Sequence, residues 1–183
     1  TGLEGQRILL EGQIGTYSPQ ASGQPTGPIY LTALAVRLLG NDILAVRIVP
    51  ALLGVLTLLA LYFVARPAFG VTVAIIAAAL LATMTWHVHF SRIGFPLAAW
   101  PLCVVLTTGA VMEAIRRKSW GWWAAAGALA GLGLYSYNAH PLFLAILGLF
   151  VGLTGLQGLT RDGRQGLRPF LLGPMLMAVV LFI

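Results

Sequence analysis

The stretch DILAVRIVPALLGVLTLLALYFVAR, residues 42–66, decides the fold class of this chain. Arg47 is the only charged residue between its two charged ends. A transmembrane helix needs about 20 consecutive, mostly apolar residues to cross the ~30 Å hydrocarbon core of a bilayer. The stretch meets this length and therefore predicts a membrane-spanning helix over about 43–65.

The composition places the whole chain in the same class. Of its 183 residues, 58% are hydrophobic and 9% are charged, whereas a soluble domain carries about 25% charged residues. The formal net charge of +6 comes from basic residues in short loops, without the interleaved aromatics of a nucleic-acid-binding face. The single cysteine, Cys103, excludes an intramolecular disulfide and a cysteine-based metal site. We therefore predict a membrane protein without a nucleic-acid partner.

Further apolar segments follow residues 42–66 and predict an all-α, polytopic transmembrane protein with about six spans. Residues 1–42 are more polar and predict an external loop with two amphipathic surface helices, at 3–12 and 28–40. The chain begins at Thr1 without an initiator Met and stops inside an apolar run, so we expect a fragment truncated at both ends. The predicted spans are 43–65, 71–87, 95–115, 120–137, 141–158 and 169–183.

Basic residues in alternate loops predict the orientation of these spans. Positive charge accumulates in cytoplasmic loops. Seven of the 11 basic residues lie in loops on one side: Arg66, Arg116, Arg117, Lys118, Arg161, Arg164 and Arg168. That side is predicted to be the cytoplasmic side of a plasma (inner) membrane. The external side then carries residues 1–42, 87–94 and 135–140, so three polar stretches converge on one face.

Two arginines on the external side are the candidate lipid-phosphate ligands. Arg47 lies one helical turn inside Asp42, and a cation at that depth pairs with a carboxylate such as Asp42 or Glu4, or faces a polar cavity. Arg92 lies in WHVHFSRIGFP, residues 86–96. A guanidinium presents paired donors that match phosphate oxygens. We therefore predict phosphate binding by Arg47 and Arg92, with an internal ion pair as the alternative for Arg47.

The polar residues near these arginines are candidate substrate-lining residues. His87 and His89 stand two apart with few carboxylates nearby, so a zinc site is weakly supported and no metal site is predicted. The alternative for this turn is interfacial capping of the span. For YSYNAHP, residues 135–141, the alternative is an aromatic belt. The predicted lining residues are His89, Ser91, Tyr137, Asn138 and His140.

Motifs for several other chemistries are absent from the sequence. It has no P-loop, GxSxG, HExxH or dinucleotide-binding fingerprint, so a cytosolic nucleotide-driven reaction has no support. Glu4 and Glu11 share a helical face, but we interpret them as solvated surface carboxylates and not as catalytic bases. Two possibilities remain: an active site on the external side that receives its substrate from the bilayer, or no active site.

Three motifs in this order resemble those of bacterial GT-C glycosyltransferases. They are Arg-x-x-Pro-Ala-Leu at 47–52, Trp-His-x-His-x-Ser-Arg at 86–92 and Gly-Leu-x-Leu-Tyr-x-Tyr at 131–137. Over nearly its whole length the chain is similar to the polytopic enzymes related to protein O-mannosyltransferases and the lipid A aminoarabinose transferase. It departs from their pattern at Pro96 and His140, where relatives often carry arginine.

The resemblance implies an inverting transferase that moves a hexosyl or pentosyl group from a polyprenyl-phosphate carrier to an acceptor on the external face. The implied partners are this lipid-linked sugar, the lipid bilayer and an acceptor that is a protein, a lipid or a glycan. The family's catalytic aspartate lies in the first external loop and is expected upstream of Thr1, which implies that this fragment alone is inactive. No cofactor is assigned, and a divalent cation is compatible with the implied reaction.

The sequence leaves two other function classes open. A transporter or flippase would line a substrate path with Arg47, Arg92 and His140. Transporters, however, place polar residues near the midplane of broken spans, whereas the polar groups here are predicted at one face. A non-catalytic membrane scaffold is the other class. An Asp-Glu pair just upstream of Thr1 would favour the enzyme, and its absence would favour the other two.

Overall fold

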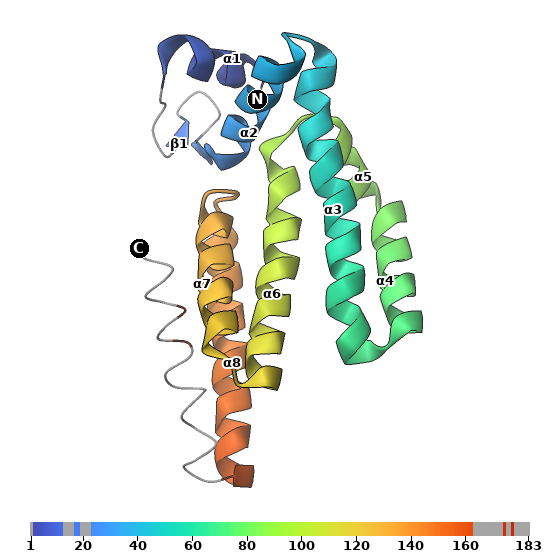
Figure 1. Ribbon diagram of the computed structural model, residues 1–183, viewed down its shortest axis with the longest axis vertical. Helices are drawn as coiled ribbons and strands as arrows, with labels where there is room; N and C mark the ends of the chain where they lie inside the picture. The colour runs from blue at the N-terminus through green and yellow to red at the C-terminus, as the bar shows by residue number, and fades with distance from the viewer. Residues whose placement is uncertain (1, 13–16, 19–22, 163–173, 175–176, 178–183) are drawn as a thin grey trace.

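The computed structural model describes residues 2–12, 17–18, 23–162, 174 and 177. In chain order its elements are α1 (Gly2–Glu11), β1 (Tyr17–Ser18), β2 (Gln24–Pro25), α2 (Gly27–Leu39), α3 (Ile43–Phe69), α4 (Val71–Thr83), α5 (Thr85–Arg92), the 3-10 helix η1 (Pro96–Ala98), α6 (Ala99–Arg117), α7 (Trp120–Leu134) and α8 (His140–Asp162). Figure 1 shows a bundle of long helices with α1 and α2 across one end. Helices α3, α6 and α8 run away from that end, and α4 and α7 return toward it (Figure 1). The described chain is all-α, as the sequence predicts, apart from two very short strands.

Helices α1 and α2 form a small layer across one end of the bundle. Pro28 lies in the first turn of α2, where its missing N–H leaves no helical hydrogen bond unmade. Gly5 of α1 lies against the backbone of α2, because a Cβ on Gly5 would be 3.3 Å from the nitrogen of Ala33. Strands β1 and β2 pair antiparallel in a segment with no predicted regular structure. The position of this layer at a membrane surface stays a prediction.

Helix α3 has a clear signal at each end. The carboxylate of Asp42 accepts a hydrogen bond from the backbone nitrogen of Ile43 at 2.6 Å. Gly70 follows the helix with a φ of 86°, and its N–H donates to the carbonyl of Arg66 at 3.0 Å. Both α3 and α6 are long and apolar enough to cross a membrane, with mean hydropathies of 2.5 and 1.2.

The second predicted span, 71–87, is not one straight helix. Helices α4 and α5 meet at Met84, whose ψ of 120° is extended, and their axes differ by 59°. No glycine or proline occurs between residues 71 and 92. Instead α5 packs on α3, where Nε2 of His87 donates to the carbonyl oxygen of Gly54 at 3.3 Å. This contact with α3 accounts for a bend that has no local signal in the sequence.

The expected number of about six spans is not confirmed. By length and composition the described residues contain two helices that could cross a membrane, or three if α4 and α5 form one bent span. Helix α7 has 15 residues, which is about 22 Å at ~1.5 Å per residue, because the chain turns at Tyr135. The apolar part of α8, His140–Gly155, is also short. Of the predicted span 169–183, the structure describes only residues 174 and 177.

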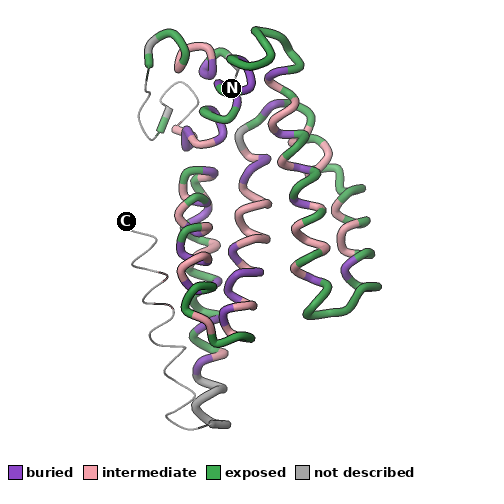
Figure 2. The backbone as a smooth tube through the Cα atoms, viewed as in Figure 1, coloured by how far each residue is buried: buried purple, intermediate pink, exposed green. Residues whose placement is uncertain are grey.

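The hydrophobic core lies between α6, α7 and α8. Its buried side chains are Ala110, Val111, Ala114, Trp123, Ala126, Leu147 and Val151. Figure 2 shows buried residues along both α6 and α7. Several of them are alanines, and small residues let transmembrane helices approach closely. Helix α3 joins this core through α6, where Gly109 packs against Val64.

Replacement of Gly109 by alanine is expected to lower the free energy of unfolding by about 1–3 kcal/mol, the usual cost of overpacking. The new Cβ would collide with Val64, whose branched side chain is rigid. Gly148→Ala in α8 is the matched control, because no atom lies within 4 Å of its Cβ position. Thermal unfolding of the full-length protein in detergent measures both variants. Equal midpoints would contradict the close contact between α3 and α6.

Candidate functional site

Three polar stretches of the chain lie at the same end of the bundle, which we call the polar end (Figure 1). They are the α1–α2 layer, residues 87–94 in α5 and the turn that follows it, and the turn between α7 and α8 at residues 135–139. Gly94, with a φ of +68°, brings the first of these turns onto α3, because a Cβ there would lie 2.9 Å from Cγ1 of Val46. The polar end is therefore formed by contacts between segments that are distant in the sequence.

The α7–α8 turn is held against the segment that precedes α2. The N–H of Gly27 donates to the carbonyl of Tyr135 at 3.2 Å, and a Cβ on Gly27 would lie only 2.5 Å from that oxygen. Nδ2 of Asn138 donates to the carbonyl of Gly23 at 3.1 Å. Asn138 thus joins two parts of the polar end, and its contact with a substrate stays a prediction.

His140 is fully buried beneath this turn, with 0% of its surface exposed. Its Nδ1 accepts a hydrogen bond from Nε1 of Trp100 at 3.2 Å, so the neutral ring carries its proton on Nε2. The ring covers Gly133, where an added Cβ would collide with it. Burial lowers the pKa of His140 from its ordinary value of 6.5, and the carbonyl of Ala130 opposes the shift in part. Nε2 has no well-formed hydrogen bond within the described structure.

Trp100 connects two of the predicted lining residues and was not itself among the residues predicted from the sequence. Besides its hydrogen bond to His140, its ring lies 5.2 Å from the ring of Tyr137 at an interplanar angle of 50°. Tryptophan is common wherever a helix enters a membrane, so its position near the start of a predicted span does not by itself indicate a site. Its location on the same predicted side as YSYNAHP was the available signal.

Helix α5 turns its polar residues in different directions. The hydroxyl of Ser91 donates to the carbonyl of His87 at 2.7 Å, and Gly54 of α3 leaves the space that this hydroxyl occupies. His89 is exposed, and its ring meets Phe90 edge-on at 5.6 Å. The two histidines therefore diverge, and the described residues contain no cluster of metal-ligating side chains.

An apolar pocket of about 260 Å³ lies beside α5. It is bounded by the ends of α4 and α5, by η1 and by the start of α6, and its polar wall consists of His87, Ser91 and Trp100. Trp86 and Phe90 stack at 5.3 Å on the same wall. The pocket brings together Ser91 and Trp100 from different helices. The other predicted lining residues do not border it: His89, Tyr137, Asn138 and His140.

Both candidate phosphate ligands, Arg47 and Arg92, are exposed at the polar end. Within the described part of the chain neither guanidinium has an ion pair or a hydrogen bond. The internal ion pair considered for Arg47 is therefore not observed, and Asp42 instead caps α3. Glu4 is buried, with 7% exposure, because α1 packs on α2. This burial corrects its interpretation as a solvated carboxylate, and the side chain of Glu11 lies outside the description.

A family model described as dolichyl-phosphate-mannose-protein mannosyltransferase matches residues 23–182. The chain belongs to this family. The match confirms the resemblance to GT-C glycosyltransferases that the three sequence motifs carry. No curated protein and no solved structure matches the chain.

The match to the mannosyltransferase family covers both exposed arginines, the pocket beside α5 and all three motifs. It begins at Gly23, after α1. Together with the apolar helices α3 and α6, it identifies the chain as a membrane glycosyltransferase. The reaction class thus comes from the family.

The stability of this mannosyltransferase-family protein is expected to fall as the pH drops from about 7.5 to 5.5. Folding favours neutral His140, whereas the unfolded chain takes up a proton near pH 6.5. Below that value, one such group removes at most about 1.4 kcal/mol per pH unit, until the folded state is protonated as well. His140→Gln keeps an acceptor for Trp100 without titrating, and should flatten the dependence.

Thermal midpoints of the full-length protein at several pH values measure this effect. His89→Gln is the control, because His89 is exposed and its loss should leave the pH dependence as in the wild type. A His140→Gln variant that retained the full pH dependence would show that another group causes it.

Proposed function

We propose that this protein transfers a sugar from a polyprenyl-phosphate carrier to an acceptor at its polar end, on the external face of the plasma membrane. The observation that carries the proposal is the pair of exposed guanidinium groups, Arg47 and Arg92, at the end where the polar turns gather. No described carboxylate neutralises either group, so both are available to an anion. Membership of a glycosyltransferase family supplies the reaction class.

The proposed reaction breaks the bond between the anomeric carbon of the sugar and a phosphate oxygen of the carrier. An acceptor hydroxyl or amine attacks that carbon from the opposite face, and its proton passes to a carboxylate base. Polyprenyl phosphate leaves with the bonding electron pair, and the configuration inverts. Negative charge grows on the leaving phosphate, so guanidinium donors bind it more strongly in the transition state than in the ground state. Arg47 and Arg92 are assigned this role.

Two carboxylates with described side chains lie at the polar end, and neither is assigned as the catalytic base. The carboxylate of Asp42 already accepts the capping hydrogen bond of α3, and Glu4 is buried in the α1–α2 layer. The aspartate of the first external loop, which the sequence resemblance implies, is the proposed base.

The pocket beside α5 is proposed to hold the part of the polyprenyl chain nearest the phosphate. Its walls are mostly apolar, and Arg92 directly follows Ser91 of its polar wall. An amphiphile in this pocket would therefore carry its phosphate near Arg92. At 260 Å³ the pocket lies just below the ~300–1,000 Å³ of typical ligand sites, which suits the first isoprene units of the carrier. The residues proposed to line the adjoining sugar and acceptor region are His89, Ser91, Tyr137, Asn138 and His140.

The distribution of basic residues supports an external polar end. Arg66 at the end of α3 and the run of Arg116, Arg117 and Lys118 at the end of α6 lie at the opposite end of the bundle. Because positive charge marks cytoplasmic loops, the polar end is proposed to face the outside. The acceptor would then be a protein, a lipid or a glycan of the cell envelope.

Arg92→Ala and Arg47→Ala in the full-length protein should each lower sugar transfer roughly 100-fold, as expected when one donor to a developing anion is removed. Arg92→Lys retains the charge but loses the paired donors, and should show an intermediate loss. The assay follows radiolabelled mannose from polyprenyl-phosphate-mannose into acceptors in membranes that contain the protein.

Arg66→Gln at the opposite end is the matched control and should retain wild-type transfer. Thermal midpoints of all variants separate loss of activity from loss of folding. Wild-type transfer by both alanine variants would overturn the assigned roles. Movement of the intact donor across the membrane, without release of sugar, would instead support a transporter.

A further inference from the structure

A second apolar cavity lies at the end of the bundle opposite the polar end, and we call it the basic-end groove. It lies between α3, α6, α7 and α8 and has a volume of about 590 Å³, which is within the ~300–1,000 Å³ of typical ligand sites. Leu106 and Leu129 contribute to its apolar walls. Phe63 and Phe150 also line it and are 63% and 48% exposed, so the groove is open to the surroundings of the bundle.

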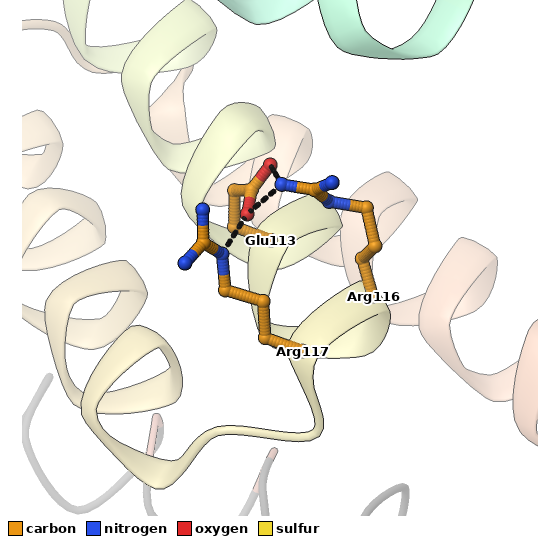
Figure 3. Close-up of polar contacts among 3 residues, drawn as sticks. All are labelled: Glu113, Arg116 and Arg117. Carbon is orange, nitrogen blue, oxygen red and sulfur yellow. Dashed lines mark hydrogen bonds and ion pairs between the residues drawn. The ribbon is translucent and has the colours of Figure 1, made fainter.

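A charged cluster at the end of α6 borders the groove. Figure 3 shows Glu113 between two arginines. Its carboxylate accepts two hydrogen bonds from Nη2 of Arg116, both at 2.7 Å, and one from Nε of Arg117 at 2.5 Å. The guanidinium of Arg117 also lies 5.9 Å from the ring centroid of Trp122. These contacts hold both guanidinium groups at the border of the groove.

The charged cluster has an excess of positive charge. One carboxylate, Glu113, faces two guanidinium groups, and Lys118 follows directly in the chain. Arg116 and Arg117 each retain 57% side-chain exposure. One terminal nitrogen of Arg116 and both terminal nitrogens of Arg117 make no contact with Glu113 and point away from it (Figure 3). The cluster can therefore donate hydrogen bonds to a further anion without losing its internal contacts.

We propose that the basic-end groove binds an anionic membrane phospholipid. One acyl chain lies along Leu106, Leu129 and Phe150, and the headgroup phosphate accepts hydrogen bonds from the outward nitrogens of Arg116 and Arg117. Basic pockets between transmembrane helices on the cytoplasmic side are suited to anionic headgroups. The arrangement of apolar walls with cations at one border matches an amphiphile with a negative head. It does not match an apolar helix from a second copy, which would bring no anion to balance the excess positive charge of the cluster.

This site is independent of the proposed sugar transfer. The two candidate phosphate ligands of the donor lie at the polar end, and the basic-end groove lies at the other end of α3 and α6. A resident phospholipid would fill the space between α3 and the α7–α8 pair, and would therefore stabilise the packing of α3 on the core. Its binding can be measured without any glycosyl acceptor or donor.

The experiment places the full-length protein in nanodiscs of phosphatidylglycerol and phosphatidylcholine and measures retained lipids by native mass spectrometry. The wild type should retain phosphatidylglycerol in preference to phosphatidylcholine. Arg116→Gln and Arg117→Gln should each lower this preference about fivefold, the effect of roughly one basic side chain at a membrane surface. Each single variant leaves one arginine to pair with Glu113, which protects folding.

Two further variants sharpen the test. Arg66→Gln removes a cation at the same end that does not line the groove, and should leave the preference unchanged. Leu106→Trp narrows the groove at its apolar wall and should lower retention of both lipids, with thermal unfolding as the check on folding. Equal retention of the two lipids by the wild type would overturn the proposal. Retention that is unaffected by Leu106→Trp would do the same, because another segment or a second copy would then occupy the groove.

Discussion

The close packing of neighbouring helices against α3 is the constraint on which the rest of the structure depends. Helices α2, α4, α5 and α6 all pack against it. Three of the tightest contacts occur where a glycine leaves space for a neighbouring side chain or backbone: Gly54, Gly94 and Gly109. In a bilayer the hydrophobic effect does not draw helices together, so close van der Waals packing and hydrogen bonds must hold them. The bend between α4 and α5 follows from this constraint, because α5 reaches Gly54 only by leaving the direction of α4.

The two ends of the bundle hold their cations in different ways. At the polar end Arg47 and Arg92 stand apart from the carboxylates that the structure describes. At the other end Glu113 holds Arg116 and Arg117 in place and still leaves an excess of positive charge. A guanidinium without an ion pair can bind negative charge that develops during a reaction. Guanidinium groups that a carboxylate already holds in place suit a ligand that stays bound. We therefore propose that both ends recognise a lipid phosphate. At the polar end this recognition serves sugar transfer, and in the basic-end groove it serves structural binding.

Much of the candidate site was predictable from the sequence, and the rest depended on contacts over long sequence separations. Arg47 and Arg92 could be found because a charge in an apolar chain needs an explanation. Trp100 could not, because its hydrogen bond to His140 joins residues 40 positions apart. The burial of Glu4 was also missed, since it arises only when α1 packs on α2. A local sequence pattern shows which residue types are present, but it does not show which helices pack together.

The sequence by itself determined the all-α class, the membrane environment and the family. These follow from composition, apolar length and ordered motifs, which are properties of the chain read along its length. Only the tertiary structure decided the 59° bend at Met84, the burial of His140 and the assembly of the pocket beside α5. Among the residues that the structure describes, it also showed two or three helices with the length and composition to cross a membrane, so the expected number of about six is not confirmed. The physical reason is that this bend, this burial and this pocket arise from packing between helices, and such packing leaves no local signal in the sequence.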